Sequence, residues 1–201
     1  MVTPGNHEFW YNFSAYKARF YMPGVMTEPA EGSGNGSGDN MFYSWNFGPV
    51  HIISMNSETA IDVANMPTGE VAWAEADLQA VDRTQTPWVL ANFHRPLYCS
   101  YGNDCSDKMT VNMRGEIEEV FMKYHIDAVV YGHVHAYERT YPMYNSTKVT
   151  DNYNNPGAPV YLLQGASGNR EGNKGSVLPV DQLPSWSAVQ FNQVGYAVMQ
   201  V

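Results

Sequence analysis

Two short apolar runs in the middle of the chain each lead into a histidine, and this feature constrains the fold most. Residues 87–93 and 126–131 have the length of buried strands, and they are followed by His94 and His133. Between them, residues 112–124 have the apolar spacing of an amphipathic helix. Strand, helix, strand in this order predicts parallel strands of an α/β sheet, whose carboxyl ends form the edge where ligands bind.

Further elements extend this core on both sides. Helices are expected over 68–83, capped by Thr68, and from a cap at Asn12 to about Phe20. Additional strands are expected at 41–47, 50–55, 159–164, 188–192 and 196–201, with Gly48-Pro49 as a hairpin turn. The pattern predicts an α/β fold with mixed sheets in one domain, because the chain has no internal repeat and no linker.

Composition excludes several classes of partner. The 201 residues include 44% hydrophobic and 15% charged residues, and the net charge is -9. An acidic chain of this kind lacks the basic surface that binds nucleic acid, so no nucleic-acid partner is expected. The apolar runs are too short to span a bilayer and no basic amphipathic helix occurs, so no membrane partner is expected.

Cysteines and glycosylation sequons point to the compartment. Cys99 and Cys105 are either two free thiols or a short-loop disulfide formed in an oxidising compartment. A secreted or extracellular protein is favoured by three sequons, at Asn12, Asn35 and Asn145. Residues 1–8 are not a signal peptide, so we expect the natural N-terminus to lie further upstream.

Histidines at the ends of separate strands are the candidate metal ligands. His133 and His135 form a His-x-His pair after one strand, and His94 ends another. Asn6-His7 adds an amide oxygen and a further imidazole in a glycine-led turn. Imidazole nitrogens bind transition metals, and an amide oxygen suits a hard cation. The alternative is that these histidines are satisfied by separate hydrogen bonds.

Four motifs together carry a family resemblance. They are Gly5-Asn6-His7-Glu8, His94-Arg95-Pro96-Leu97-Tyr98, Gly132-His133-Val134-His135-Ala136-Tyr137-Glu138-Arg139 and Gly165-Ala166-Ser167-Gly168-Asn169-Arg170-Glu171-Gly172. Their order resembles the calcineurin-like metallophosphoesterases, and their extended form resembles the purple acid phosphatases in particular. The similarity covers nearly the whole chain. It implies a four-layer αββα sandwich with the site at the sheet edge.

The resemblance also implies a role for each matching residue. Asn6, His94 and His133 match ligands of a divalent metal, and His135 matches a ligand of a ferric ion. His7 matches a histidine that contacts the phosphate and assists the leaving group. The implied enzyme is an acid phosphatase that hydrolyses small phosphate monoesters. Its dinuclear centre would hold Fe(III) with Zn, Fe or Mn and would supply a metal-bound hydroxide.

Two earlier motifs of the family, Asp-x-Gly and Gly-Asp-x-x-Tyr, do not occur in the chain. They would supply the carboxylates that bridge two metals. Residues 1–201 are therefore expected to be a partial catalytic domain, which lacks the first strands and any β-sandwich domain. We expect the isolated chain to bind metal weakly, and the dinuclear centre only in the full-length protein. The alternatives are an inactive or metal-poor pseudoenzyme fragment, or a phosphodiesterase of the same superfamily.

Residues next to the motifs have two interpretations each. Glu8 either orients a site residue or is a solvated turn residue, and we favour the first. Arg95 either contacts substrate or forms a surface ion pair. Tyr137 either lines the pocket or packs in the core, and core packing is favoured.

Other polar residues are expected to be structural. Glu138 and Arg139 are interpreted as an ion pair that fixes the His-x-His turn. His51 lies within a predicted strand, where we expect it to be a structural polar residue.

Overall fold

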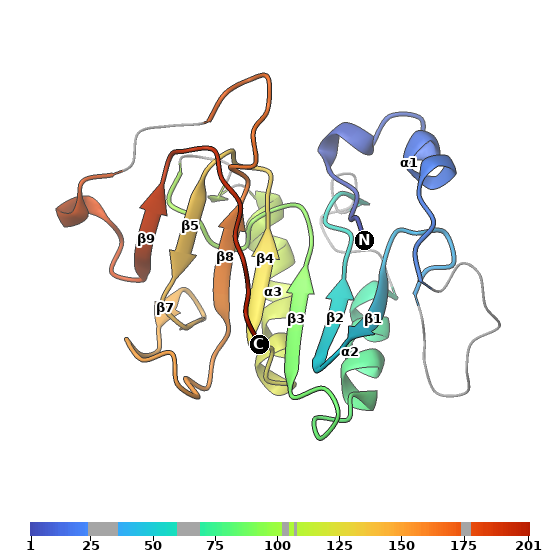
Figure 1. The fold of residues 1–201 in the computed structure, drawn as a ribbon, viewed down its shortest axis with the longest axis horizontal. Helices are drawn as coiled ribbons and strands as arrows, with labels where there is room; N and C mark the ends of the chain where they lie inside the picture. The colour runs from blue at the N-terminus through green and yellow to red at the C-terminus, as the bar shows by residue number, and fades with distance from the viewer. Residues whose placement is uncertain (24–35, 60–68, 102–104, 107, 174–177) are drawn as a thin grey trace.

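A seven-stranded mixed sheet organises the chain (Figure 1). The computed structural model describes residues 1–23, 36–59, 69–101, 105–106, 108–173 and 178–201. Its helices are η1 (Asn6–Glu8), α1 (Ser14–Arg19), α2 (Glu70–Ala80), α3 (Lys108–Lys123) and η4 (Val180–Gln182). Its strands are β1 (Tyr43–Phe47), β2 (Val50–Ser54), β3 (Trp88–Asn92), β4 (Ala128–Tyr131), β5 (Tyr137–Thr140), β6 (Met143–Tyr144), β7 (Thr147–Lys148), β8 (Val160–Gln164) and β9 (Ser187–Phe191).

The strand order is β1-β2-β3-β4-β8-β5-β9, and β6 pairs with β7 in a separate small sheet. Strands β2, β3, β4 and β8 run parallel, whereas β1, β5 and β9 pair with antiparallel neighbours. The expected α/β class with a mixed sheet is confirmed. The described residues supply one large sheet and a helix layer of the expected sandwich.

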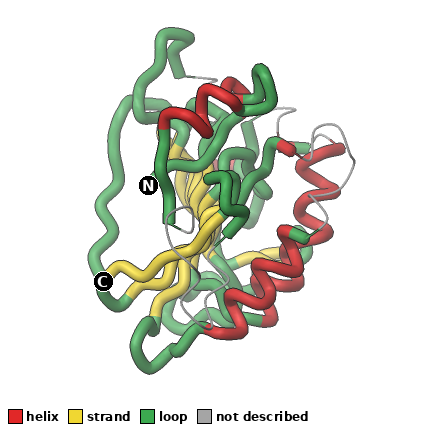
Figure 2. Tube along the Cα trace, turned by 90° about the vertical axis from the view of Figure 1, so that its right-hand side faces the viewer, coloured by secondary structure: helices red, strands yellow, loops and turns green. Residues whose placement is uncertain are grey.

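Helices α2 and α3 cover one face of the large sheet (Figure 2). Alternate strand residues such as Val89, Val129 and Tyr161 are fully buried under them. The helices pack because their apolar residues recur at helical spacing, as with Met113 and Ile117 of α3. Among the described residues, no helix has both the length and the apolar character needed to cross a membrane.

The parallel strands all end at one edge of the sheet, because they share a direction. Segments that follow β2, β3, β4 and β8 therefore meet there: residues 55–59, 93–95, 132–136 and 165–166. The first residues of the chain join this edge, where the Thr3 hydroxyl donates to the carbonyl of Met55 at 2.8 Å. The topology thus gathers the predicted strand-end residues.

Helix ends differ from the sequence predictions. Phe13, not Asn12, is the N-cap residue of α1, and its backbone is left-handed with φ 58°. Helix α2 starts after Gly69 and ends at Ala80, because residues 82–86 form a turn in which Asp82 accepts from Thr84. Thr68 lies outside the described residues. Helix α3 begins four residues earlier than predicted, at Lys108.

Strand predictions were wrong at residues 196–201 and at β5, and the short β6 and β7 were also missed. Residues 196–201 do not form a strand and pair with none of the described strands; the segment crosses the sheet face opposite the helices (Figure 1). Strand β5 was missed, because its sequence Tyr-Glu-Arg-Thr lacks an apolar pattern. The Gly48-Pro49 hairpin is confirmed, since Phe47 pairs with Val50 across it.

Candidate metal centre

Three side-chain donor atoms converge at the sheet edge. The Asn6 Oδ1 atom lies 2.8 Å from His94 Nε2, and His133 Nδ1 lies 3.2 Å from the same nitrogen. The two imidazole rings are inclined by 73° with centroids 5.0 Å apart. Two ligands on adjacent positions around one cation are about 3 Å apart when each bond is about 2.1 Å long. The spacing of the three atoms fits one cation between them.

The turn that carries Asn6 is fixed by Glu8. Its Oε2 atom accepts from the Gly5 amide at 2.9 Å, and the Glu8 amide donates to the Gly5 carbonyl at 3.0 Å. These reciprocal bonds close the turn in the manner of a capping box. Glu8 therefore acts on the backbone that presents Asn6.

Gly5 allows the His94 ring to approach this turn. A Cβ atom at Gly5 would lie 2.9 Å from two atoms of the His94 ring, closer than real Cβ contacts. Gly132, the glycine before His133, is much less crowded, because a Cβ atom there would lie 4.0 Å from His94 Nδ1. The close packing of the cluster thus depends on the glycine from the N-terminal turn.

The His-x-His turn has a strained backbone at its first histidine. His133 has φ 66°, a left-handed conformation that a non-glycine residue rarely adopts. The Gly132 amide donates to the His94 carbonyl at 2.9 Å, and the Val134 amide donates to the Gly132 carbonyl at 2.8 Å. These bonds hold His133 in a conformation that aims Nδ1 at His94. Strain of this kind concentrates at functional sites.

His135 leaves a buried ring nitrogen unsatisfied. Its Nδ1 atom is inaccessible to solvent and has no hydrogen-bond partner among the described residues. Gly165 packs behind this turn, where a Cβ atom would lie 1.8 Å from the Val134 carbonyl oxygen. The Gly165 amide also donates to the Ala136 carbonyl at 3.0 Å. An orphaned imidazole nitrogen on a firmly supported turn is a suitable metal ligand.

The His94 imidazole is held in its neutral form. Burial, with smaller contributions from nearby His133 and Arg95, lowers the pKa of the His94 imidazole to about 3. The neutral imidazole, which is the form that binds metals, therefore persists into the acidic range. Within the described residues, no group of three or more His, Cys, Asp or Glu side chains is placed to hold a metal ion. The cluster is instead two imidazoles and an amide, which fit the neutral part of a cation site.

An ion pair lies directly beside the cluster. Arg95 Nε is 3.2 Å from both carboxylate oxygens of Glu58, and Arg95 Nη1 is 3.3 Å from His133 Nε2. The Glu58 side chain is 0% exposed and the Arg95 side chain 11%. Sequence reasoning considered Arg95 but missed Glu58. The sequence feature that could have indicated Glu58 is its position, because it is a charged residue that follows the end of a buried strand by four residues.

His7 and Tyr137 lie at the margins of the site. His7 is exposed on η1, one residue after Asn6, and its charge contributes to lowering the pKa of His94. Tyr137 opens β5 and is half-buried, with its ring 5.7 Å from that of Phe191. Phe191 is itself exposed, so this contact lies at the surface, and both interpretations of Tyr137, pocket lining and core packing, stay predictions.

The expected ion pair between Glu138 and Arg139 is wrong. Adjacent residues of a strand point to opposite faces of the sheet. Glu138 is buried and accepts from the Ser100 amide at 2.8 Å and the Ser187 hydroxyl at 2.6 Å. Arg139 lies over the ring of Tyr153, 5.1 Å from its centroid. Glu138 therefore ties the loop after β3 to β5, next to the His-x-His turn.

Covalent features bear on the compartment. Cys99 and Cys105 form a disulfide with Cα atoms 5.2 Å apart, and both residues are buried. Two of the three sequon asparagines, Asn12 and Asn145, are exposed. Asn35 lies outside the described residues.

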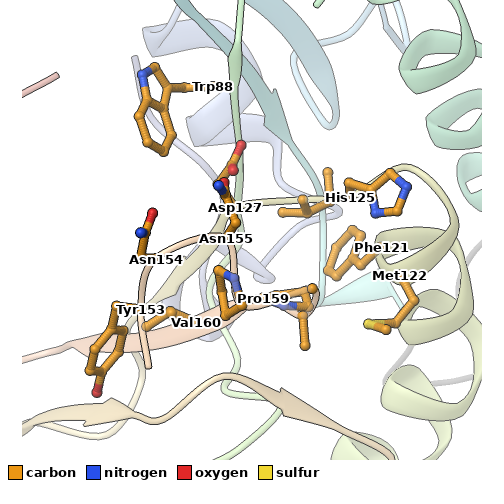
Figure 3. A pocket seen from close by; sticks show the side chains of 14 residues that line it. Trp88, Phe121, Met122, His125, Asp127, Tyr153, Asn154, Asn155, Pro159 and Val160 are labelled. Atoms are coloured by element: carbon orange, nitrogen blue, oxygen red, sulfur yellow. The ribbon is translucent and has the colours of Figure 1, made fainter. Parts of the chain in front are cut away.

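A cavity of about 350 Å³ lies at the other edge of the sheet. It is lined by residues at the starts of β3, β4 and β8, such as Trp88, Asp127 and Val160. Figure 3 shows Asp127 and Asn155 between the aromatic rings of Trp88 and Tyr153. The cavity is separated from the histidine cluster by the length of the strands, so it is not part of the candidate centre.

Comparison with curated proteins finds acid phosphatases. The chain is 34% identical to human acid phosphatase type 7 over 219 residues, which is 100% of this chain and 46% of that protein. It is 38% identical to purple acid phosphatase 23 of Arabidopsis thaliana over 177 residues, 85% of this chain and 34% of that protein. The chain thus spans less than half the length of these relatives.

Structural comparison finds the same fold. Purple acid phosphatase PPD1 from yellow lupin (Lupinus luteus) seeds matches with a TM-score of 0.73 and 23% identity, over 92% of this chain and 30% of that one. The profile of iron/zinc purple acid phosphatase-like protein C matches residues 158–201. The calcineurin-like phosphoesterase profile matches residues 1–137. The chain therefore belongs to the calcineurin-like phosphoesterase family and, within it, to the purple acid phosphatases.

Proposed function

We propose that these 201 residues form the C-terminal part of the catalytic domain of an acid phosphatase that hydrolyses small phosphate monoesters. One observation carries the proposal: at the sheet edge, Asn6 Oδ1 lies 2.8 Å and His133 Nδ1 lies 3.2 Å from His94 Nε2. The family supports phosphatase chemistry, and the relatives are named acid phosphatases.

The metal-binding roles divide between two positions in the proposal. Asn6, His94 and His133 would hold a divalent cation, Zn, Fe or Mn. His135, whose buried Nδ1 lacks a partner among the described residues, would bind Fe(III). When bound, the two cations supply charge neutralisation on phosphate and activation of a water molecule. The neutral state of His94 in acid supports this role at the pH of an acid phosphatase.

Other residues act on the substrate and on the turn. The exposed imidazole of His7, next to Asn6, would donate a proton to the leaving oxygen of the ester. The Arg95 guanidinium beside His133 supplies positive charge to the phosphate side. Glu8 fixes the turn through the Gly5 amide.

We further propose that the protein is a secreted glycoprotein. The Cys99–Cys105 disulfide is of the kind that persists in oxidising compartments. Exposed sequon positions at Asn12 and Asn145 are accessible to glycosylation.

The test compares the isolated chain with the full-length protein that contains it. Metal stoichiometry is measured for both by mass spectrometry of the dialysed proteins, and hydrolysis is measured with p-nitrophenyl phosphate and bis-p-nitrophenyl phosphate. We expect two metals and monoesterase activity at acidic pH in the full-length protein. The isolated chain is expected to hold metal weakly and to be nearly inactive, because it contributes only neutral ligands from Asn6, His94 and His133.

Three outcomes contradict parts of the proposal. Two tightly bound metals in the isolated chain would show that the division of ligands is wrong. A preference for the diester would identify a phosphodiesterase instead. A full-length protein without metal and without hydrolysis would show a pseudoenzyme.

A further inference from the structure

A carboxylate that the proposed chemistry does not use is completely buried beside the metal centre. The Glu58 side chain is 0% exposed, and it follows β2 at the edge where the ligand residues meet. Burial raises the pKa of Glu58, while the charge of Arg95 opposes this. A buried carboxylate is costly unless it is paired, so its partners indicate what it does.

Both ends of the pair are held by the same short loop. The Arg95 amide donates to the Ser57 hydroxyl oxygen at 3.0 Å, and the Ser57 hydroxyl donates to Glu58 Oε1 at 3.0 Å. The Glu58 amide donates to the Asn56 side-chain oxygen at 2.9 Å. Residues 56–58 therefore fix the backbone of Arg95, the Glu58 carboxylate and the direction of the guanidinium.

The contact with Glu58 uses the Nε edge of the guanidinium. Nε lies 3.2 Å from each carboxylate oxygen, which leaves the Nη groups directed elsewhere. Nη1 lies 3.3 Å from His133 Nε2. When His133 binds a cation through Nδ1, its Nε2 carries a proton and does not accept from Arg95. The Nη1 donor then keeps its charge beside the His133 ring and is available to another acceptor.

The fixed positive charge of Arg95 next to metal ligands opposes metal binding unless a negative charge offsets it. Like charges in a buried site repel, and Glu58 offsets this repulsion at the far side of the guanidinium. An arginine fork suits phosphate, because its planar N–H donors match two phosphate oxygens. An anion bound at the centre would meet the Nη donors from a defined direction.

We infer that Glu58 is a positioning residue that fixes the Arg95 guanidinium beside His133, so that its Nη groups contact the phosphate of the substrate. This inference rests on the proposed phosphatase function and names a residue beyond the metal ligands. Glu58 does not touch the substrate. It acts by restricting the rotamers of Arg95 and by removing the cost of holding an unpaired cation next to the metals.

The test measures metal and phosphate binding separately in the full-length protein. Zn²⁺ affinity is determined first, and inorganic phosphate is then titrated into the Zn²⁺-loaded protein by calorimetry. We expect Arg95→Met and Glu58→Gln each to weaken phosphate binding by about tenfold to a hundredfold, the range for a charge-assisted hydrogen bond. Zn²⁺ affinity is expected to change less than phosphate affinity, falling in Glu58→Gln and rising in Arg95→Met as the net charge beside His133 changes, because neither residue supplies a ligand atom.

A double variant and a conservative variant distinguish positioning of Arg95 by Glu58 from a general stabilising role of Glu58. The double variant of Glu58→Gln and Arg95→Met is expected to be no weaker than Arg95→Met alone, because both changes remove one function. Glu58→Asp keeps the charge and should restore part of the phosphate affinity. Arg83→Met is the matched control: Arg83 also pairs with a carboxylate, Asp127 at 3.0 Å, but at the opposite edge of the sheet.

The possible results separate this inference from the proposed function. Phosphate affinity unchanged in Glu58→Gln but reduced in Arg95→Met would overturn the role of Glu58. Phosphate affinity unchanged in both, in proteins with normal thermal unfolding, would overturn the anion contact. Loss of Zn²⁺ in the Glu58 and Arg95 variants, including Glu58→Asp, would show a purely structural pair. Failure of the wild-type protein to bind Zn²⁺ would instead contradict the proposed function.

Discussion

Two histidine sites in the same sheet use their ring nitrogens in opposite ways. His51 is buried in β2, with Nδ1 2.7 Å from Asn46 Oδ1 and Nε2 2.8 Å from Asp77 Oδ2. Both of its nitrogens thus meet an oxygen acceptor of the protein. In the candidate centre, His94 Nε2 meets two partners at once, an imidazole nitrogen of His133 and the amide oxygen of Asn6, although a ring nitrogen carries at most one proton.

The difference separates a histidine whose ring nitrogens are both used by the fold from one that is proposed to bind a ligand. The bonds of His51 join the β1–β2 hairpin to α2 and leave no polar atom for a further partner. Lone pairs directed at one another repel unless a proton or a cation lies between them. One proton on His94 Nε2 serves only one of its two contacts fully, whereas a cation would serve both, which supports the proposed cation site at Asn6, His94 and His133. The prediction that His51 is structural agrees with its contacts.

The largest expected effects come from replacing His51 or His94 by alanine. His51→Ala leaves the Asp77 carboxylate buried beside α2 without its basic partner, so we expect a loss of about 3 kcal/mol in the free energy of unfolding. Its Zn²⁺ affinity should stay within about twofold of wild type. His94→Ala should change stability of the metal-free protein by less than about 1 kcal/mol and weaken Zn²⁺ binding at least a hundredfold, about the upper limit for residues that only support ligands.

Urea unfolding and Zn²⁺ titration of the two variants check this. His51→Gln, which keeps one of the two hydrogen bonds, serves as an intermediate control. If His51→Ala lost Zn²⁺ while His94→Ala was merely less stable, the assignment of the two sites would be reversed.

The next largest effect is expected at Gly165, whose backbone packs behind the turn that carries His133 and His135. A Cβ atom at Gly165 would lie 1.8 Å from the Val134 carbonyl oxygen, so Gly165→Ala must displace the turn or β8. We expect a loss of about 2 to 3 kcal/mol in unfolding free energy, typical of overpacking, together with weaker Zn²⁺ binding. Gly132→Ala, where the nearest atom would be 4.0 Å away, is the control.

Thermal and urea unfolding of the two glycine variants provide the measurement. Equal stability of both variants would mean that Gly165 does not support the turn, and the rigidity inferred for the cluster would lose its basis.

Glu70 is a second buried carboxyl group of α2. Unlike Asp77, which contacts His51, it has no basic partner among the described residues. Glu70 is buried in the first turn of α2; its Oε1 accepts from the Asn56 amide at 2.6 Å, whereas Oε2 lacks a partner among the described residues. Burial raises the pKa of Glu70 to about 8 from an ordinary value of 4.5. The folded state therefore binds more protons than the unfolded state between these values.

Stability should consequently fall as pH rises through this window. We expect the wild type to lose up to about 3.5 kcal/mol of unfolding free energy between pH 5 and pH 8 through Glu70. Glu70→Gln, which cannot ionise, should remove this part of the slope. Urea unfolding at a series of pH values is the measurement, and an identical pH slope in the variant would show that Glu70 ionises normally.

Much of the candidate centre was predictable because it is encoded locally. Runs 87–93 and 126–131 predicted β3 and β4, and the polar residue after each run predicted where His94 and His133 lie. The roles of Glu58 and Glu138 were not predictable from the same pattern. Each is a single charged residue whose burial depends on partners 37 or more residues away, namely Arg95 and Ser100.

The sequence by itself determined the parallel strands, the edge at which they end and the family of the chain, because hydrophobic periodicity and short motifs are local properties. Only the tertiary structure decided which side chains meet. Asn6 and His94 are 88 residues apart, and their 2.8 Å contact requires a Gly5 turn docked on the end of β2. Likewise, only packing decided that both ring nitrogens of His51 meet oxygen atoms of the protein while His94 Nε2 meets an amide oxygen and a second imidazole, since the residue type alone does not set the partners of a histidine.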